Sequence, residues 1–187
     1  MDIYYHGSSV LFDKFDLSHA LEGDGKIKFG FGVYLSPKYH SAAHYSGKNR
    51  DASAHYVYTV QIPELTEDNH IDFHQPVHPN IVCRAEQKLG LTIPQEAIDD
   101  GNPFRKFIAK TLHGSLGFAA EKAASEFLLS IGVEYITRPF SWRNLSLGIE
   151  RVMLDTTKIN IIKIEQVELD CKQQLVTGSQ KTIFELP

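Results

Sequence analysis

The sequence predicts a single domain with an α+β fold. Two observations support this: strand-like segments rich in β-branched and aromatic residues gather at both ends of the 187-residue chain, and helical patterns gather in its middle. Alternating strand–helix–strand units, which would predict a parallel α/β fold, are missing. A chain of this length buries about 70 % of its unfolded surface, which is enough for one core. The hydrophobic fraction of 42 % and the charged fraction of 22 % are ordinary for a globular domain.

The first third of the chain predicts three strands and one helix. A strand is expected over 2–6, where turn-forming glycine and serine residues end it. A second strand is expected over 29–37, after a polar connection and a glycine-rich bend. Pro37 suits the first turn of a helix that continues to about Tyr45. A third strand is expected over 56–62, because this segment is rich in aromatic and β-branched residues.

The segment from 64 to 132 is mainly helical in character and predicts a helical insert. In its first long helix, apolar side chains recur every three or four residues, at Phe104, Phe107, Ile108 and Leu112. A second pattern of this kind runs from Ala120 to Ile131, and Gly132 is its candidate C-cap residue. Both patterns indicate helices with one buried face.

The last third returns to strands. Strands are expected at 133–137, 149–155 and 158–169. The alternation of apolar residues slips by one position between Ile161 and Ile162, which predicts a β-bulge there. A final hairpin is expected to pair 175–177 with 182–184 through a turn at Gly178.

The charge and the cysteine content exclude several classes of function. Nineteen Lys and Arg residues against 23 Asp and Glu residues give a net charge of −4. This total leaves no electrostatic footprint for bulk nucleic-acid or membrane binding, so nucleic acid is the less favoured partner and no membrane partner is expected. No export signal is recognisable and no apolar run is long enough to span a bilayer, which predicts a cytoplasmic protein. Cys83 and Cys171 are expected to be reduced.

Three separated segments carry the residues that point to a specific chemistry. The first is His6-Gly7-Ser8, at the end of the first predicted strand. The second is Gly30-Phe31-Gly32-Val33-Tyr34, followed by Tyr45 eleven positions after its tyrosine. The third is Glu150-Arg151-Val152-Met153-Leu154-Asp155, which opens a late strand.

In order and spacing, these segments resemble the catalytic core of the ADP-ribosyltransferases of the His-Tyr-Glu class, which includes the poly(ADP-ribose) polymerases and diphtheria toxin. The resemblance covers both ends of the sequence, about half of the chain. It implies a core made of a split antiparallel β-sheet, interrupted by the insert at 64–132. The sequence departs from the family pattern at Arg151, where the family has Tyr, at Met153, where it has Val, and at Ala42, where it often has a Ser that binds the nicotinamide carboxamide.

The resemblance implies NAD as the substrate and no metal. Glu150 would be the carboxylate that stabilises the oxocarbenium-like state formed when the nicotinamide–ribose bond breaks. Tyr34 and Tyr45 would hold the nicotinamide ring between them, and His6 would hydrogen-bond the adenosine ribose. The implied catalytic residues are Glu150, His6 and Tyr34. The implied NAD-binding residues are His6, Gly7, Ser8, Gly32, Tyr34, Ser41 and Tyr45.

The implied activity is transfer of a single ADP-ribose to a macromolecular acceptor, with a protein favoured, by an enzyme of the kind found as bacterial or phage effectors and toxins. The connection 11–28 and the insert would recognise this acceptor. Gly148, two positions before Glu150, disfavours the arginine-specific branch, which has Glu or Gln there. Polymer formation is disfavoured because the sequence carries no regulatory helical domain or DNA-binding module.

Other readings stay open. The same fold serves non-catalytic modules that bind NAD, ADP-ribose or another protein, and it serves NAD glycohydrolases. An RNA 2′-phosphotransferase shares the fold and the first motif, but that enzyme uses arginines near its His motif, and none lies near His6 in the sequence. His70, His74 and His78 have the four-residue spacing of a helical zinc site, yet Pro76 interrupts the helix, and a metal site is not expected.

Overall fold

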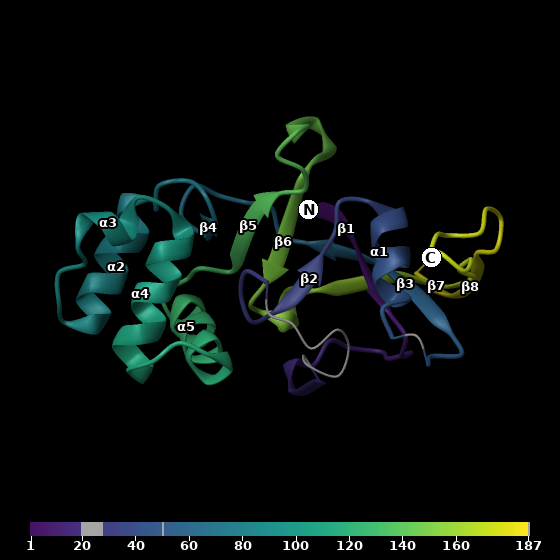
Figure 1. Ribbon diagram of the computed structural model, residues 1–187, viewed down its shortest axis with the longest axis horizontal. Coiled ribbons are helices and arrows are strands. Elements are labelled where there is room, and N and C mark those ends of the chain that lie inside the picture. Colours follow the sequence, from purple (N-terminus) through teal and green to yellow (C-terminus); the bar gives the residue numbers. More distant parts are fainter. Residues whose placement is uncertain (20–27, 50, 187) are drawn as a thin grey trace.

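The computed structural model, which describes residues 1–19, 28–49 and 51–186, has an α+β architecture with two four-stranded sheets (Figure 1). Sheet A is antiparallel and consists, in spatial order, of β1 (Asp2–Ser8), β3 (His55–Ile62), β7 (Asn160–Val167) and β8 (Lys181–Glu185). Sheet B is mixed and consists of β2 (Val33–Leu35), β6 (Ile149–Met153), β5 (Tyr135–Pro139) and β4 (His70–Asp72). The predicted α+β class is confirmed.

Five α-helices are present in the described part of the chain. They are α1 (Tyr39–Ser46), α2 (Pro79–Leu89), α3 (Gln95–Ile98), α4 (Gly101–His113) and α5 (Phe118–Ser130). Helices α2 to α5 gather at one end of the molecule, beyond β4 and β5, whereas α1 lies beside β1 and β3 (Figure 1). The segment 64–132 therefore forms the expected helical insert, and it also contributes β4, which pairs in parallel with β5.

One detail of the strand prediction is confirmed and two are wrong. Ile162 is the extra residue of a bulge between β3 and β7, as the alternation predicts. However, β1 does not stop before Gly7 but continues to Ser8, because β3 supplies pairing partners for both residues. The final hairpin also does not form, since β8 pairs with β7 rather than with 175–177.

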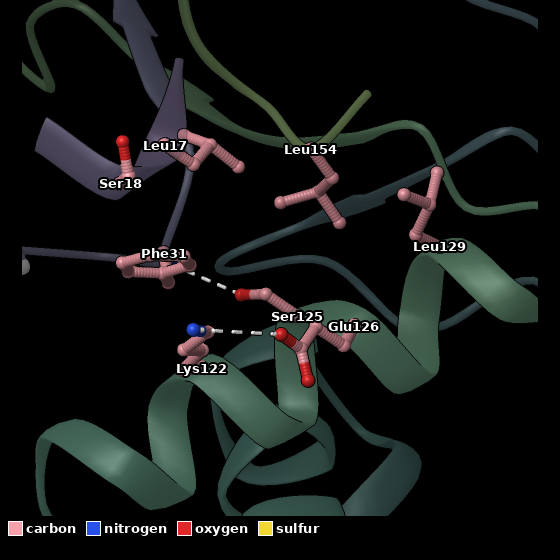
Figure 2. Close-up of a pocket in the computed structure, with 8 residues that line it drawn as sticks. All are labelled: Leu17, Ser18, Phe31, Lys122, Ser125, Glu126, Leu129 and Leu154. Atoms are coloured by element: carbon pink, nitrogen blue, oxygen red, sulfur yellow. Dashed lines mark hydrogen bonds and ion pairs between the residues drawn. The ribbon is translucent and has the colours of Figure 1, made fainter. Parts of the chain in front are cut away.

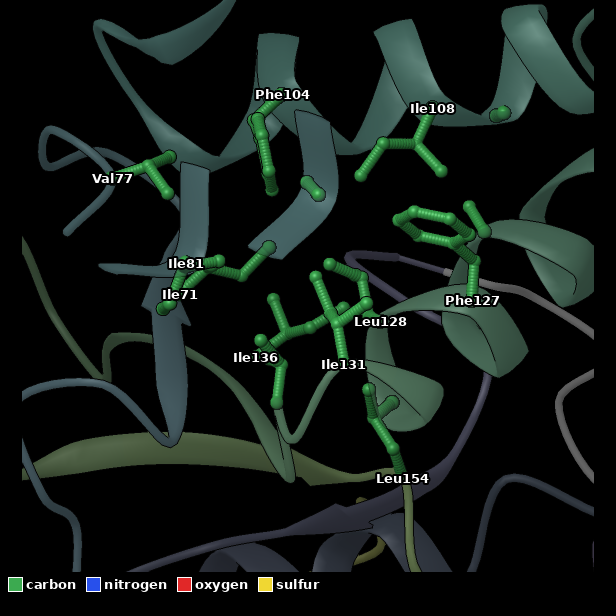
Figure 3. Close-up of a cluster of buried hydrophobic side chains, with 14 of the residues drawn as sticks. Ile71, Val77, Ile81, Phe104, Ile108, Phe127, Leu128, Ile131, Ile136 and Leu154 are labelled. Carbon is green, nitrogen blue, oxygen red and sulfur yellow. The ribbon is translucent and has the colours of Figure 1, made fainter. Parts of the chain in front are cut away.

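The two faces of sheet B lie in different apolar clusters. One face packs against the insert, where side chains from α2, α4 and α5 surround Ile71 of β4, Ile136 of β5 and Leu154 (Figure 3). The other face contributes Val33, Leu35, Tyr135 and Met153 to a cluster shared with sheet A. Each strand of sheet B thus sends alternate side chains toward the insert and toward sheet A, as period-two alternation requires.

In the described part of the chain, one backbone β-bridge connects β1 of sheet A with the end of β2 of sheet B. The Tyr5 N–H donates to the Ser36 carbonyl at 2.9 Å, and the Ser36 N–H donates to the Tyr5 carbonyl at 2.8 Å. Beyond this bridge β1 and β2 separate. Because backbone groups two residues apart point to the same side of a strand, the N–H and C=O of Gly7 point toward β2 and not toward β3. The sheet is therefore split beside Gly7.

Within the described residues, none of the helices combines the length and the apolar character needed to cross a bilayer. Residues 20–27, within the connection 11–28 expected to recognise the acceptor, lie outside the described residues, so only the ends of that connection are placed.

Candidate functional site

Tyr34 lies in the middle of β2, and its side chain packs against the cluster on the insert side of sheet B. Its hydroxyl accepts hydrogen bonds from the N–H groups of Lys28, at 2.7 Å, and Phe29, at 3.1 Å. It donates to the Gly30 carbonyl at 2.9 Å. Burial raises the pKa of this hydroxyl, an effect that the two N–H donors partly offset. The hydroxyl therefore holds the 28–30 segment in place as a neutral group.

Glu150 points to the same side of sheet B as Tyr34, because it shares its face of β6 with Val152 of the insert-side cluster. Only 8 % of the residue is exposed. Its Oε2 atom accepts a hydrogen bond from Nε of Arg138 at 2.6 Å and forms an ion pair with Nη2 of the same side chain at 2.5 Å. Arg138 is the residue directly opposite Glu150 in the pairing of β5 with β6. The carboxylate is thus paired within its own sheet.

Phe29 connects the surroundings of these two side chains. The Arg138 guanidinium lies over the Phe29 ring, 4.4 Å from its centroid. The same ring meets Tyr34 edge-on, with the two centroids 5.1 Å apart. Phe29 is 1 % exposed. A chain of contacts therefore runs from Tyr34 through Phe29 and Arg138 to Glu150.

Arg105 adds a second guanidinium on this side of sheet B, and unlike that of Arg138 it is buried. It extends from α4, pairs with Glu121 of α5 and lies over the Phe73 ring, 5.8 Å from its centroid. Burial lowers the pKa of Arg105, although a guanidinium stays protonated under ordinary conditions. The charges of Arg105 and Arg138 both favour the ionised form of Tyr34 and lower its pKa slightly against the effect of burial.

His6 lies on β1 with its ring in the cluster between the two sheets. Its neighbours are aromatic: its ring centroid is 5.2 Å from Phe15 and 6.2 Å from both Phe12 and Tyr58. The Nδ1 atom is 2.9 Å from the Tyr34 carbonyl, where a neutral ring donates its N–H. Burial lowers the pKa of His6, and the hydrogen bond to this carbonyl opposes the effect. His6 is therefore held as a neutral imidazole with Nδ1 protonated.

Gly7 is required by the close approach of α1. A β-carbon on this residue would lie 1.8 Å from the Ala42 carbonyl oxygen. Only glycine allows the helix backbone to come this near to β1. The substitution of Ala for the family's Ser at position 42 thus falls at the contact between α1 and β1.

Three other predicted NAD-binding residues have identifiable local roles or positions. Ser8 accepts a hydrogen bond from the Val10 N–H at 3.0 Å and so stabilises the turn after β1. A β-carbon on Gly32 would lie 2.4 Å from the Met153 carbonyl oxygen, so glycine permits the packing of this segment on β6. Ser41 lies on α1 four residues before Tyr45, on the same face of the helix.

Tyr45 is the more exposed of the two tyrosines, with 37 % of its surface accessible. Its hydroxyl is 3.1 Å from the Nζ atom of Lys28, which donates to it. Since the backbone N–H of Lys28 bonds to Tyr34, Lys28 links the two tyrosines that the resemblance places around the nicotinamide ring.

The structure thus brings Tyr34, Tyr45 and Glu150 into one connected set, whereas the His6 ring reaches this set only through the Tyr34 carbonyl. Sequence reasoning missed Arg138, Phe29 and Lys28. Phe29 and Lys28 directly precede the glycine motif, and this proximity was an available signal. Arg138 gave no signal, because its position opposite Glu150 depends on the pairing of β5 with β6.

The best-formed pockets lie away from these residues. One, of about 270 Å³, is enclosed by α5, the segment at Leu17 and Ser18, Phe31 and Leu154 (Figure 2). Figure 2 shows Phe31 bonded through its N–H to Ser125 of α5, which closes one wall. Another, of about 420 Å³, lies between the end of α1, His55 and residues 169–173. Neither is lined by His6, Tyr34, Tyr45 or Glu150.

The three histidines spaced four residues apart do not share a helix. His70 belongs to β4, and His78 caps the N-terminus of α2 through its Nδ1 atom. Within residues 1–19, 28–49 and 51–186, no three His, Cys, Asp or Glu side chains are grouped as a metal would need.

Comparison with known proteins leaves the family of this chain open. No protein-family model matches the sequence, and no match was found among curated proteins or solved structures. The resemblance therefore rests on the three motifs alone.

Proposed function

We propose that this protein is an NAD-dependent mono-ADP-ribosyltransferase with the fold of that family. In this proposal it binds NAD as a substrate beside Tyr34, Tyr45 and Gly7 and uses Glu150 to stabilise the transition state. Arrangement in space supports the proposal beyond the order of the motifs: Tyr34 and Glu150, 116 positions apart in the sequence, lie on one face of sheet B and are connected through Phe29 and Arg138. This connection is the observation that carries the proposal.

The reaction would break the bond between C1′ of the ribose and the nicotinamide nitrogen. The bonding electron pair leaves with nicotinamide, which becomes neutral, and positive charge develops on the ribose. A carboxylate stabilises this charge and can accept a hydrogen bond from a ribose hydroxyl. A nucleophile of the acceptor then forms the new bond to C1′ and loses its proton. Glu150 is a candidate for this role because its carboxylate is held in place by the ion pair with Arg138.

The split beside Gly7 suits recognition of the nicotinamide carboxamide. An amide group needs one donor and one acceptor side by side, and a strand backbone supplies both. The Gly7 N–H and C=O point toward β2, on the side where β1 and β2 separate. Backbone recognition at Gly7 would make the hydroxyl at position 42 dispensable.

The acceptor in this proposal is a protein. A net charge of −4 gives no general attraction for nucleic acid. The enzyme would act in a cytoplasm, either in the cell that makes it or in one that receives it as an effector.

A second reading has a specific observation in its favour. Glu150 is already paired with Arg138, and the Tyr34 hydroxyl already has three hydrogen bonds. Groups satisfied in this way are also expected in a module that binds NAD, ADP-ribose or another protein without catalysis. NAD glycohydrolysis, with water as the acceptor, is the third reading.

The experiment compares nicotinamide release from NAD by the wild-type protein and by Glu150→Gln, with NAD binding measured by calorimetry for both. Loss of one electrostatic stabiliser should lower the rate by at least about 100-fold, or ~3 kcal/mol, with NAD affinity retained. Equal and negligible rates with intact binding would refute the catalytic proposal and favour a binding module. Release that does not increase when a lysate supplies acceptors would favour the glycohydrolase.

A further inference from the structure

Arg138 holds Glu150 by one oxygen only. Both short contacts, from Nε at 2.6 Å and Nη2 at 2.5 Å, go to Oε2. Among the described residues, none donates a hydrogen bond to Oε1. A bidentate pair would usually engage both oxygens of the carboxylate. Here the guanidinium contacts one oxygen twice, and within residues 1–19, 28–49 and 51–186 the other oxygen has no hydrogen-bond donor.

The position of the guanidinium is itself fixed. Arg138 lies directly opposite Glu150 in the antiparallel pairing of β5 and β6, so the two side chains leave the sheet from adjacent backbone positions. The guanidinium also lies on the face of the buried Phe29 ring, 4.4 Å from its centroid. A planar cation stacked on an aromatic ring has little freedom to turn. The strand pairing and the ring together set the direction from which Arg138 approaches Glu150.

We propose that Arg138 is a positioning residue for Glu150, fixing the rotamer of this side chain so that Oε1 faces the ribose of bound NAD. This inference rests on the proposed function. The cation is the partner of the carboxylate charge, and the contacts of Nε and Nη2 with one oxygen fix the orientation of the carboxylate. Lysine could supply the charge but not the fork, because an ammonium group is a single point of contact. The role is therefore geometric as well as electrostatic.

The test is a double-mutant cycle on nicotinamide release. Arg138→Gln should lower kcat by about 10- to 100-fold, since a displaced catalytic group loses this much, while KM for NAD changes little. In the Glu150→Gln background the same substitution should have almost no further effect, because Arg138 acts through Glu150. Arg138→Lys should recover only part of the lost rate.

Arg84→Gln is the matched control. Arg84 donates to Asp68 at 2.9 Å within the insert, so its substitution also breaks an arginine–carboxylate pair, but one away from Glu150. It should leave kcat unchanged. Thermal melting of all variants reports how much folded protein each assay contains.

Three results would overturn the inference. An equal loss of rate from Arg138→Gln in both backgrounds would show a purely structural role. Full recovery by Arg138→Lys would show that charge alone matters. A wild-type protein no more active than Glu150→Gln would refute the proposed function itself and the positioning role with it, and this result differs from the first two, in which the wild-type protein is active.

Discussion

The rings of Tyr34 and His6 come from neighbouring strands and yet lie in two different interiors. On the insert side of sheet B, Tyr34 is surrounded by polar groups that have partners: the N–H groups of the 28–30 segment and the guanidinium of Arg138. Between the sheets, His6 is surrounded by the rings of Phe12, Phe15 and Tyr58. The pKa of His6 is lowered by burial, which shows that its surroundings do not compensate a positive charge.

The difference teaches that paired charges lie beside Tyr34 and Glu150, whereas the surroundings of the His6 ring are aromatic. Glu150 is buried with the half-buried Arg138 as its partner, and the buried Arg151 on the other face of β6 has Asp2 as its partner, because burial of an unpaired charge would cost several kcal/mol. The between-sheet cluster offers His6 only the Tyr34 carbonyl. The insert side can therefore stabilise a developing charge, and the between-sheet side holds a neutral hydrogen-bond donor.

The largest expected effect comes from forcing α1 away from β1, the strand that carries His6. In Gly7→Ala the added β-carbon would lie 1.8 Å from the Ala42 carbonyl oxygen, so α1 and β1 must separate. We expect a loss of about 3 kcal/mol in the free energy of unfolding, at the upper end for an overpacked site. Denaturant unfolding measures this loss.

Gly47→Ala is the control for that experiment. Its β-carbon would meet the end of the flexible Leu169 side chain at 2.5 Å, which can move aside, and the Gln173 side chain at an ordinary contact distance of 3.4 Å. We expect a loss smaller than about 1 kcal/mol. If the two variants were equally stable, the close approach of α1 to β1 would not be a constraint on this fold.

A smaller effect should separate the two tyrosines. Tyr34→Phe removes the acceptor for two backbone N–H groups and the donor to Gly30, and should cost about 1–3 kcal/mol because these groups are partly buried. Tyr45→Phe removes only an exposed contact with the Lys28 ammonium and should cost less than about 0.5 kcal/mol. Urea unfolding of both variants provides the comparison. Equal losses would contradict the assignment of Tyr34 as the residue that holds the 28–30 segment.

The sequence predicted the α+β class, the bulge at Ile162 and most of the buried helix faces of the insert, because each depends on local periodicity. Leu112, in the last turn of α4, was expected on the buried face and is exposed. Gly7 was expected in a turn, but the pairing of β1 with β3 overrides its local preference. The β8 strand was paired with a near neighbour in the sequence, and its partner is β7. The motifs singled out Tyr34 and Glu150 as candidate site residues. The Arg138 contact depends on strand register, which a single sequence does not reveal.

The last prediction tests the surroundings of His6 through the pH dependence of the free energy of unfolding. Because burial lowers the folded-state pKa of His6 below its ordinary value of 6.5, the unfolded chain binds the proton more readily. The stability that the neutral His6 ring contributes above pH 6.5 should therefore be lost as the pH falls from 6.5 toward the folded-state pKa. One proton contributes a slope of at most about 1.4 kcal/mol per pH unit.

His6→Gln, which keeps an N–H donor for the Tyr34 carbonyl, should remove this slope, and His40→Gln, on the exposed face of α1, should retain it. Unfolding free energies measured between about pH 5 and pH 8 decide the question. An unchanged slope in His6→Gln would mean that the between-sheet cluster accommodates a charged imidazole, and the distinction between the two sides would fail.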